Sequence, residues 1–219
     1  MSELIVKIKS RNAILRWFML IPLILSGVWF YLLEKTILTP EYILHTRLDD
    51  YIPFIPLFVF PYLFWYIYVT VPAVVLFFKA PKEFFKIALF LTSGMLIACT
   101  IYTLFPNGQN LRPQIIGENN SILLRWISII YASDTPINCA PSIHVIYSLA
   151  SHAAITYYNN NRRKIAWVNI VSFILAMLCI SSTVFIKQHS VIDVILGFFV
   201  AASLYYVIYV IGAKKRAEQ

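Results

Sequence analysis

The chain alternates between long uncharged apolar runs and short connections that carry most of its charge. Six of these runs approach the length of about 20 residues that crosses a bilayer core as a helix. They do not show the polar–apolar alternation of a membrane β-barrel. We therefore predict an all-α, polytopic membrane protein, a six-transmembrane-helix bundle in a single domain over residues 1–219. The predicted helices cover about 13–33, 53–78, 85–105, 141–158, 165–186 and 190–213.

The composition supports a membrane protein and excludes several soluble classes. Hydrophobic residues make up 60% of the chain, charged residues 13%, and the mean hydropathy is +0.74. A soluble domain carries about 45–50% apolar and about 25% charged residues. Secreted, disordered and nucleic-acid-binding proteins are therefore excluded, although the net charge is +8. We expect contacts with membrane lipids and no nucleic acid partner; the oligomeric state is not determined by the sequence.

The basic residues predict how the helices are oriented. Thirteen of the 18 Lys and Arg residues lie at the termini or in the second–third and fourth–fifth connections. Because cytoplasmic connections are enriched in Lys and Arg, both termini are predicted to be cytoplasmic. The connections at about 34–50, 106–142 and 187–193 then face outward, in a multi-pass protein of the cell membrane. We interpret Arg47, Asp49 and Asp50 in the first of them as a solvated loop.

Two polar clusters lie in these outward connections. The outer connection 106–140 contains Arg112, an interfacial amphipathic helix at about 121–131, and a polar segment that leads into His144. The second cluster, residues 182–193, lies between the fifth and sixth helices. The predicted orientation places both clusters at the same membrane face, where ionisable residues are usually functional.

His189 and Asp193 are four residues apart at the start of a predicted helix, so they share one face. The Asp193 carboxylate can accept a hydrogen bond from one ring nitrogen of His189, which leaves the other nitrogen free to act as a nucleophile. Pro141 favours the first helical position and places Ser142, Ile143 and His144 in a first turn, whose free N–H groups bind anions.

These parts are suited to phosphoryl transfer. His189 is the candidate nucleophile, and His144 is the candidate proton donor. Arg112 can add a bidentate contact to phosphate, and Ser142 with the first-turn amides can supply further donors to its oxygens. The catalytic set is therefore predicted to be His189, His144 and Asp193, and the phosphate-binding set to include Arg112, Ser142 and Ile143.

The same residues resemble the type 2 phosphatidic acid phosphatase superfamily of membrane lipid phosphatases and phosphotransferases. The three motifs of that family are Lys-x6-Arg-Pro, Pro-Ser-x-His and Ser-Arg-x5-His-x3-Asp. They are matched, in order, by Arg112-Pro113, by Pro141-Ser142-Ile143-His144, and by Ser182, His189 and Asp193 at full spacing. The resemblance implies a phosphohistidine mechanism without a metal or other cofactor.

The chain departs from the family pattern at three positions. The lysine of the first motif is replaced by Phe105, the arginine of the third by Thr183, and the usual glycine of the second by Ile143. Lys187, two residues before His189, is the nearest substitute for the missing positive charge. The departures make the motifs similar to those of the inositol phosphorylceramide synthase-like branch, which transfers phosphorylated headgroups between lipids.

The resemblance therefore implies an enzyme that acts on a phosphorylated lipid of the phosphatidic acid or polyprenyl pyrophosphate class at the outer membrane face. Two alternatives stay open. The protein could transfer a headgroup to a second lipid, or it could be a catalytically silent lipid-binding or transport protein with the same fold. The sequence does not distinguish among these three.

Overall fold

The computed structural model describes residues 14–114 and 121–212, and 77% of these residues are helical. The all-α prediction is therefore confirmed. The ends of the first and last predicted helices, residues 13 and 213, lie outside the described residues, as do the basic residues Lys7, Lys9, Arg11, Lys214, Lys215 and Arg216. In chain order the elements are α2 (Leu20–Thr36), β1 (Tyr42–Ile43), α3 (Arg47–Tyr51), η1 (Pro56–Phe58), α4 (Val59–Lys79), α5 (Pro81–Leu104), β2 (Asn107–Gly108), α6 (Ile122–Ser133), α7 (Ile143–Arg162), α8 (Ala166–Phe185), α9 (Val191–Tyr205) and the π-helical η2 (Tyr206–Ile211).

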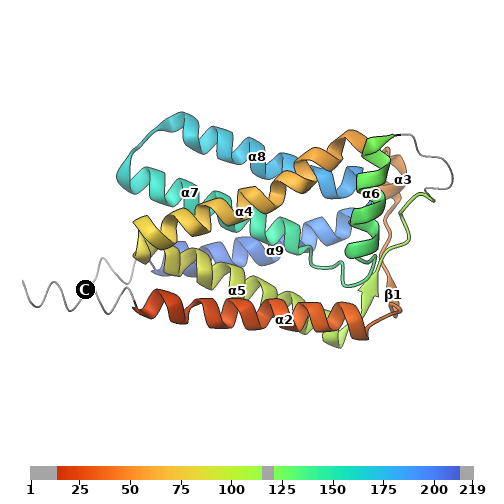
Figure 1. The fold of residues 1–219 in the computed structure, drawn as a ribbon, viewed down its shortest axis with the longest axis horizontal. Helices are drawn as coiled ribbons and strands as arrows, with labels where there is room; N and C mark the ends of the chain where they lie inside the picture. Colours follow the sequence, from red (N-terminus) through yellow and green to blue (C-terminus); the bar gives the residue numbers. More distant parts are fainter. Residues whose placement is uncertain (1–13, 115–120, 213–219) are drawn as a thin grey trace, which may run out of the picture.

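Five of the described helical segments are long and apolar enough to cross a membrane, so the chain is a multi-pass membrane protein. They are Ile14–Thr36, Pro56–Lys79, Pro81–Leu104, Ala166–Phe185 and Val191–Ile211. Helix α7 has 20 residues and lies among them (Figure 1), but it is more polar. It carries His144 and His152 and ends in three consecutive asparagines, Asn159 to Asn161. A polar helix can cross a membrane where neighbouring helices shield its polar groups.

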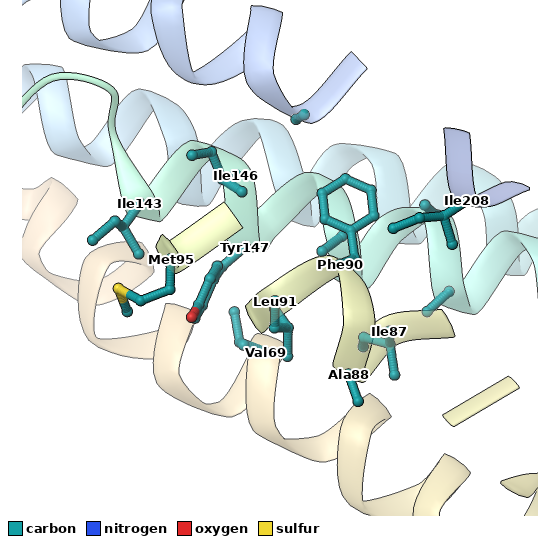
Figure 2. Close-up of a cluster of buried hydrophobic side chains, with 14 of the residues drawn as sticks. Val69, Ile87, Ala88, Phe90, Leu91, Met95, Ile143, Ile146, Tyr147 and Ile208 are labelled. Carbon is teal, nitrogen blue, oxygen red and sulfur yellow. The ribbon is translucent and has the colours of Figure 1, made fainter. Parts of the chain in front are cut away.

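Helix α5 forms the centre of the bundle. Its Ile87, Ala88 and Phe90 side chains are fully buried, and it packs against α2, α4, α7 and α9. Figure 2 shows the resulting cluster, in which side chains from α4, α5, α7 and η2 meet. By contrast, large apolar side chains on the outer helices are exposed, Phe199 and Trp167 among them. Their exposure is expected if they contact lipid.

The two ends of the bundle differ in structure. At one end lie the short turns between α4 and α5 and between α7 and α8, together with both ends of the described chain (Figure 1). At the other end, α3, α6 and the two short strands lie over the helix ends (Figure 1). The basic residues of the two turns lie at the first end, whereas both polar clusters predicted to carry chemistry lie at the second.

At that second end, a small pair of strands links the connection that follows α2 to the connection that follows α5. Strand β1 pairs in parallel with β2, and Gly108 forms a further antiparallel bridge to Ile137. A Cβ atom at Gly108 would lie 2.6 Å from the carbonyl oxygen of Pro136 and 2.9 Å from Pro40. This position therefore needs glycine, because any side chain would separate the segments that close the end of the bundle.

We predict that this closed end faces outward. A single cysteine at Asn160, exposed in the last turn of α7, should resist a membrane-impermeant thiol reagent in intact cells, whereas one at the exposed Glu41 should react. The native Cys99, Cys139 and Cys179 are replaced first, although all three are buried. Both positions should react in permeabilised cells, and the reverse pattern in intact cells would show that the site faces the cytoplasm.

Candidate active site

The start of α9 positions His189 and Asp193. Ser190 is the N-cap, and Asp193 completes a capping box by accepting a hydrogen bond from the Ser190 amide at 2.9 Å. The same carboxylate oxygen lies 3.2 Å from Nδ1 of His189. A carboxylate can only accept a hydrogen bond, so Nδ1 carries the proton and Nε2 presents a lone pair. This is the tautomer that a nucleophilic histidine requires.

His144 lies in the first turn of α7 and faces His189. Its Nδ1 is 3.3 Å from Nε2 of His189, so His144 is the donor of this hydrogen bond. The His144 ring lies against Trp65 and Tyr62, with centroid distances of 4.3 and 4.9 Å. The second ring nitrogen, Nε2, is buried and has no hydrogen-bond partner in the described chain. The structure thus brings together the two histidines and the carboxylate that the motifs predicted.

The two helices that carry the histidines are joined at their N-termini. The Ser142 amide donates to the Asp193 carbonyl oxygen at 3.1 Å. About one turn further along α9, a Cβ atom at Gly197 would lie 2.8 Å from Cβ of Val145 and 3.0 Å from the Ser142 carbonyl oxygen. Glycine at this position therefore allows α7 and α9 to approach closely enough for His144 and His189 to meet.

The first turn of α7 can bind an anion. Ser142 is the N-cap, and its hydroxyl accepts from the Val145 amide at 3.4 Å. Neither the Ile143 nor the His144 amide donates to an acceptor within the described residues. These two N–H groups and the positive end of the helix dipole are available to phosphate oxygens beside the histidine pair.

A pocket of about 380 Å³ opens over the two histidines. Its walls come from α2, α4, α5 and the segment that joins α6 to α7. Aromatic rings predominate, with Trp65, Tyr66 and Tyr102 among them, and Glu34 and Asp134 are its carboxylates. The pocket is therefore a cleft with reactive imidazoles at its base and a largely apolar wall.

Comparison with known families identifies the family of this chain. The family model of the PAP2 superfamily matches residues 57–217. The chain belongs to the PAP2 superfamily. Members of this superfamily are generally phosphoesterases or phosphotransferases, and the match covers the residues that place His144 and His189. No curated protein and no solved structure matches the chain.

Neither replaced motif position brings a cation to this PAP2 site. The Phe105 side chain is 55% exposed and lies beside Tyr42. Thr183 is fully buried, and its hydroxyl donates to the Ile180 carbonyl oxygen one turn earlier at 2.8 Å. The positive charge that PAP2 motifs place at these two positions is therefore missing here.

Arg112, the remaining cation of the first motif, binds the C-terminal end of α6. Its guanidinium donates to the carbonyl oxygens of Tyr131 and Asp134 at 3.0 and 2.6 Å, and it lies over the Tyr131 ring. Burial lowers the pKa of Arg112, an effect that the nearby Asp134 charge opposes. The guanidinium still remains charged, because its ordinary pKa lies far above neutral pH. Its predicted phosphate contact would require the side chain to turn from these carbonyls.

Lys187 joins the segment that carries His189 to the connection between α2 and α4. Its backbone has a positive φ of 58°, which ends α8 in a left-handed turn just before His189. The ammonium donates to the carbonyl oxygens of Asp49 and Ile52 at 2.8 and 2.6 Å. A phosphate contact by Lys187 stays a prediction, and it would require the ammonium to leave both carbonyls.

Asp49 is the residue that sequence reasoning missed. It was interpreted as part of a solvated loop, but its side chain is only 2% exposed. Its carboxylate accepts from the Ser190 hydroxyl at 2.7 Å and from the Val191 amide at 2.8 Å, and it caps α3 through Thr46. Burial alone would raise the pKa of Asp49, but these hydrogen bonds outweigh it and lower the pKa below its ordinary value of 3.8. A capping-box pattern, Thr46-x-x-Asp49, was the sequence signal that could have revealed it.

One group of described residues could hold a metal ion: Cys139, His189 and Asp193, whose ligand atoms lie within 4.8 Å of one another. All three are buried. However, an ion bound there would compete for the Asp193 carboxylate and the ring that it orients. A metal ion bound by this group would therefore inhibit the pair formed by His144 and His189, not assist it.

We predict that Asp49→Asn destabilises the protein and slows turnover. The substitution replaces one carboxylate oxygen by an NH2 group, so an N–H faces either the Ser190 hydroxyl or the Val191 amide, both of which are donors. This should cost about 1–3 kcal/mol of unfolding free energy. Because the folded-state pKa is lowered, ionised Asp49 stabilises the fold above pH of about 4, and this contribution is lost as the pH falls through the lowered pKa.

Thermal unfolding of purified protein, measured from pH 7 to pH 3, tests this prediction. The difference in Tm between the native protein and Asp49→Asn should shrink below a pH of about 4. Asp50→Asn is the matched control, since Asp50 is exposed and bonds only His45 in the described chain. Equal effects of the two substitutions would contradict the role of Asp49.

Proposed function

We propose that this PAP2 protein is a membrane-embedded lipid phosphatase or phosphotransferase that works through a phosphohistidine at the outer membrane face. The observation that carries the proposal is the contact between Nε2 of His189 and Nδ1 of His144, with Asp193 on the far side of the His189 ring. The phosphorus of the substrate would enter where the two imidazoles now meet. An outward site and α7 as a sixth span belong to the same proposal.

In the first step, the lone pair on Nε2 of His189 attacks phosphorus, and the bond to the leaving oxygen breaks. His144, protonated on both ring nitrogens in the substrate complex, donates one proton to that oxygen and becomes neutral. Asp193 holds the His189 ring in place and stabilises the positive charge that develops on it. The free amides of Ile143 and His144 would bind the equatorial oxygens, together with Ser142, Arg112 and Lys187 once those side chains turn toward the phosphate.

In the second step, His144 removes a proton from water or from an acceptor hydroxyl. The oxygen so activated attacks phosphorus, and the bond between phosphorus and His189 breaks. Water gives hydrolysis, whereas a lipid hydroxyl gives headgroup transfer, which is the reaction of the branch that the motifs resemble. Both acceptors use the same residues, so the choice depends on what enters the pocket.

A catalytically silent lipid-binding protein is the second candidate, and it is favoured by the missing cations at Phe105 and Thr183. The intact hydrogen-bonded series Asp193–His189–His144 supports catalysis instead. A protein that only binds lipid has no need to keep a nucleophile in its reactive tautomer. Covalent labelling therefore separates the two candidates.

We predict that His189→Ala abolishes turnover and His144→Ala nearly does so, because one removes the nucleophile and the other the proton donor. Protein incubated with ³²P-labelled phosphatidic acid or with a ³²P-labelled phosphodiester lipid, and quenched in alkaline SDS, should carry label on His189 that is stable in alkali and lost in acid. His152→Gln is the control, since His152 contacts Ser172 away from the pocket and should be nearly silent. Label that persists in His189→Ala would exclude this nucleophile.

Lys187→Ala should lower kcat by roughly 10²-fold if Lys187 supplies a preorganised donor to the transition state, and Lys187→Arg should recover part of it. Thr183→Ala should be nearly silent. Measuring Tm beside kcat separates two roles of Lys187. A fall in kcat without a fall in Tm supports phosphate contact. A fall in Tm with full activity shows that the lysine only anchors α3.

We also predict that activity does not depend on a metal. It should survive EDTA, because the Cys139, His189 and Asp193 group includes the nucleophile, and vanadate should inhibit by mimicking pentacoordinate phosphorus. Assays before and after chelation, with Mg²⁺ added back, test this. Complete loss with EDTA that Mg²⁺ restores would rule out the metal-free mechanism.

A further inference from the structure

The charges that line the catalytic pocket are unusual for a phosphate site. Two carboxylates, Glu34 and Asp134, face it, and Lys35 is the only cation among the described residues that line it. Within the described chain neither carboxylate has an oxygen within 4.0 Å of a Lys or Arg nitrogen. The pocket therefore carries more negative than positive charge at its walls.

Neutral donors hold both carboxylates in place. Asp134 accepts from the Tyr62 hydroxyl at 2.6 Å and from the Gln188 amide at 3.2 Å, both through Oδ2. Glu34 accepts from Thr135 and Asn138. Neutral donors fix the positions of the carboxylates without cancelling their charge, and no hydrogen bond within the described chain uses Oδ1 of Asp134. That oxygen is free to meet a ligand.

Two cations, Arg112 and Lys187, bind backbone carbonyl oxygens and not these carboxylates, although Arg112 lies close enough to Asp134 for their charges to interact. Arg112 binds the end of α6, and Lys187 binds α3, so neither ammonium nor guanidinium lines the pocket. A phosphomonoester or pyrophosphate carries two or more negative charges and would be repelled by Glu34 and Asp134. A phosphodiester carries one, and an ammonium group beside it would be attracted to these carboxylates.

The aromatic wall supports binding of a cation. Trp65, Tyr66 and Tyr102 line the same pocket as the carboxylates, and the face of an aromatic ring attracts an ammonium group. At the base, Nε2 of His144 is buried and has no partner in the described chain. The pocket thus combines carboxylates and aromatic rings, which attract a cation, with Nε2 of His144, which is unpaired among the described residues and lies beside the proposed nucleophile.

We propose that the pocket binds a zwitterionic phosphodiester lipid, with its phosphorus at His189 and its ammonium group near Asp134 and Glu34. This rests on the proposed phosphoryl transfer and names its substrate class. Phosphatidylethanolamine and phosphatidylcholine have this charge pattern. Phosphatidic acid lacks the ammonium and carries more negative charge, and phosphatidylglycerol is an anionic diester.

The test measures consumption of each dioleoyl lipid by the purified full chain in mixed micelles, by mass spectrometry. The kcat/KM for the zwitterionic lipids should exceed that for phosphatidic acid and phosphatidylglycerol by roughly tenfold or more. Phosphatidylglycerol is a diester without an ammonium group, so its kcat/KM separates the effect of the ammonium from the effect of the diester. Trapping of labelled His189 is followed in parallel for all the lipids.

Asp134→Asn should reduce the preference for phosphatidylethanolamine over phosphatidylglycerol by about tenfold. Glu34→Gln should act in the same direction and serves as the second variant if the first does not fold. Glu41→Gln is the matched control, because it removes an exposed carboxylate that does not line the pocket, and it should leave the preference unchanged.

Three outcomes would overturn the inference. If phosphatidic acid reacts as fast as the zwitterionic lipids or faster, with label on His189, the substrate class is wrong and the phosphoryl transfer stands. If neither folded pocket variant changes the preference, the carboxylates do not recognise the ammonium. If no lipid reacts and His189 is never labelled, the proposed function fails together with this inference.

Discussion

The site depends on one buried carboxylate, that of Asp193. It is fully buried, and it lies near no Lys or Arg nitrogen in the described chain, so it must be stabilised by hydrogen bonds. The Ser190 amide and Nδ1 of His189 supply them, while the Asp193 carbonyl oxygen accepts from Ser142. One residue therefore caps α9, sets the tautomer of His189 and joins α9 to α7. Without the carboxylate, the His189 ring would lose the partner that orients it toward His144.

The rest of the fold serves to hold this arrangement at the end of an apolar bundle. Helix α5 supplies the central packing surface, and Gly197 lets α7 and α9 approach. At the closed end, the connections between helices supply hydrogen-bond partners for backbone groups that would have none among the apolar helices. Asp49 and Lys187 show how: the first accepts from the start of α9, and the second donates back to α3. The catalytic segment is thus held on both sides.

Charge distinguishes this site from the pattern of its family. PAP2 motifs place a lysine and an arginine where this chain has Phe105 and Thr183, and the pocket presents Glu34 and Asp134 instead. Phosphoryl transfer still needs donors around phosphorus, and the free amides at the start of α7 are neutral donors that do not require an anionic substrate. A pocket of this kind is compatible with a substrate that brings its own positive charge.

Local patterns in the sequence determined the helical membrane class and the family, because long apolar runs and motif spacings are read from neighbouring residues. The i, i+4 spacing of His189 and Asp193 was sufficient to predict a hydrogen bond within one turn, and the structure shows it. The contacts of Asp49 with Ser190 and Val191 were not predictable, since these two partners lie about 140 residues away and only the packing of α3 on α9 brings them together. The contacts of Lys187, Arg112 and Asp134 were not predictable for the same reason. A flexible or charged side chain can turn to several partners, and tertiary structure decides which of them lies within reach.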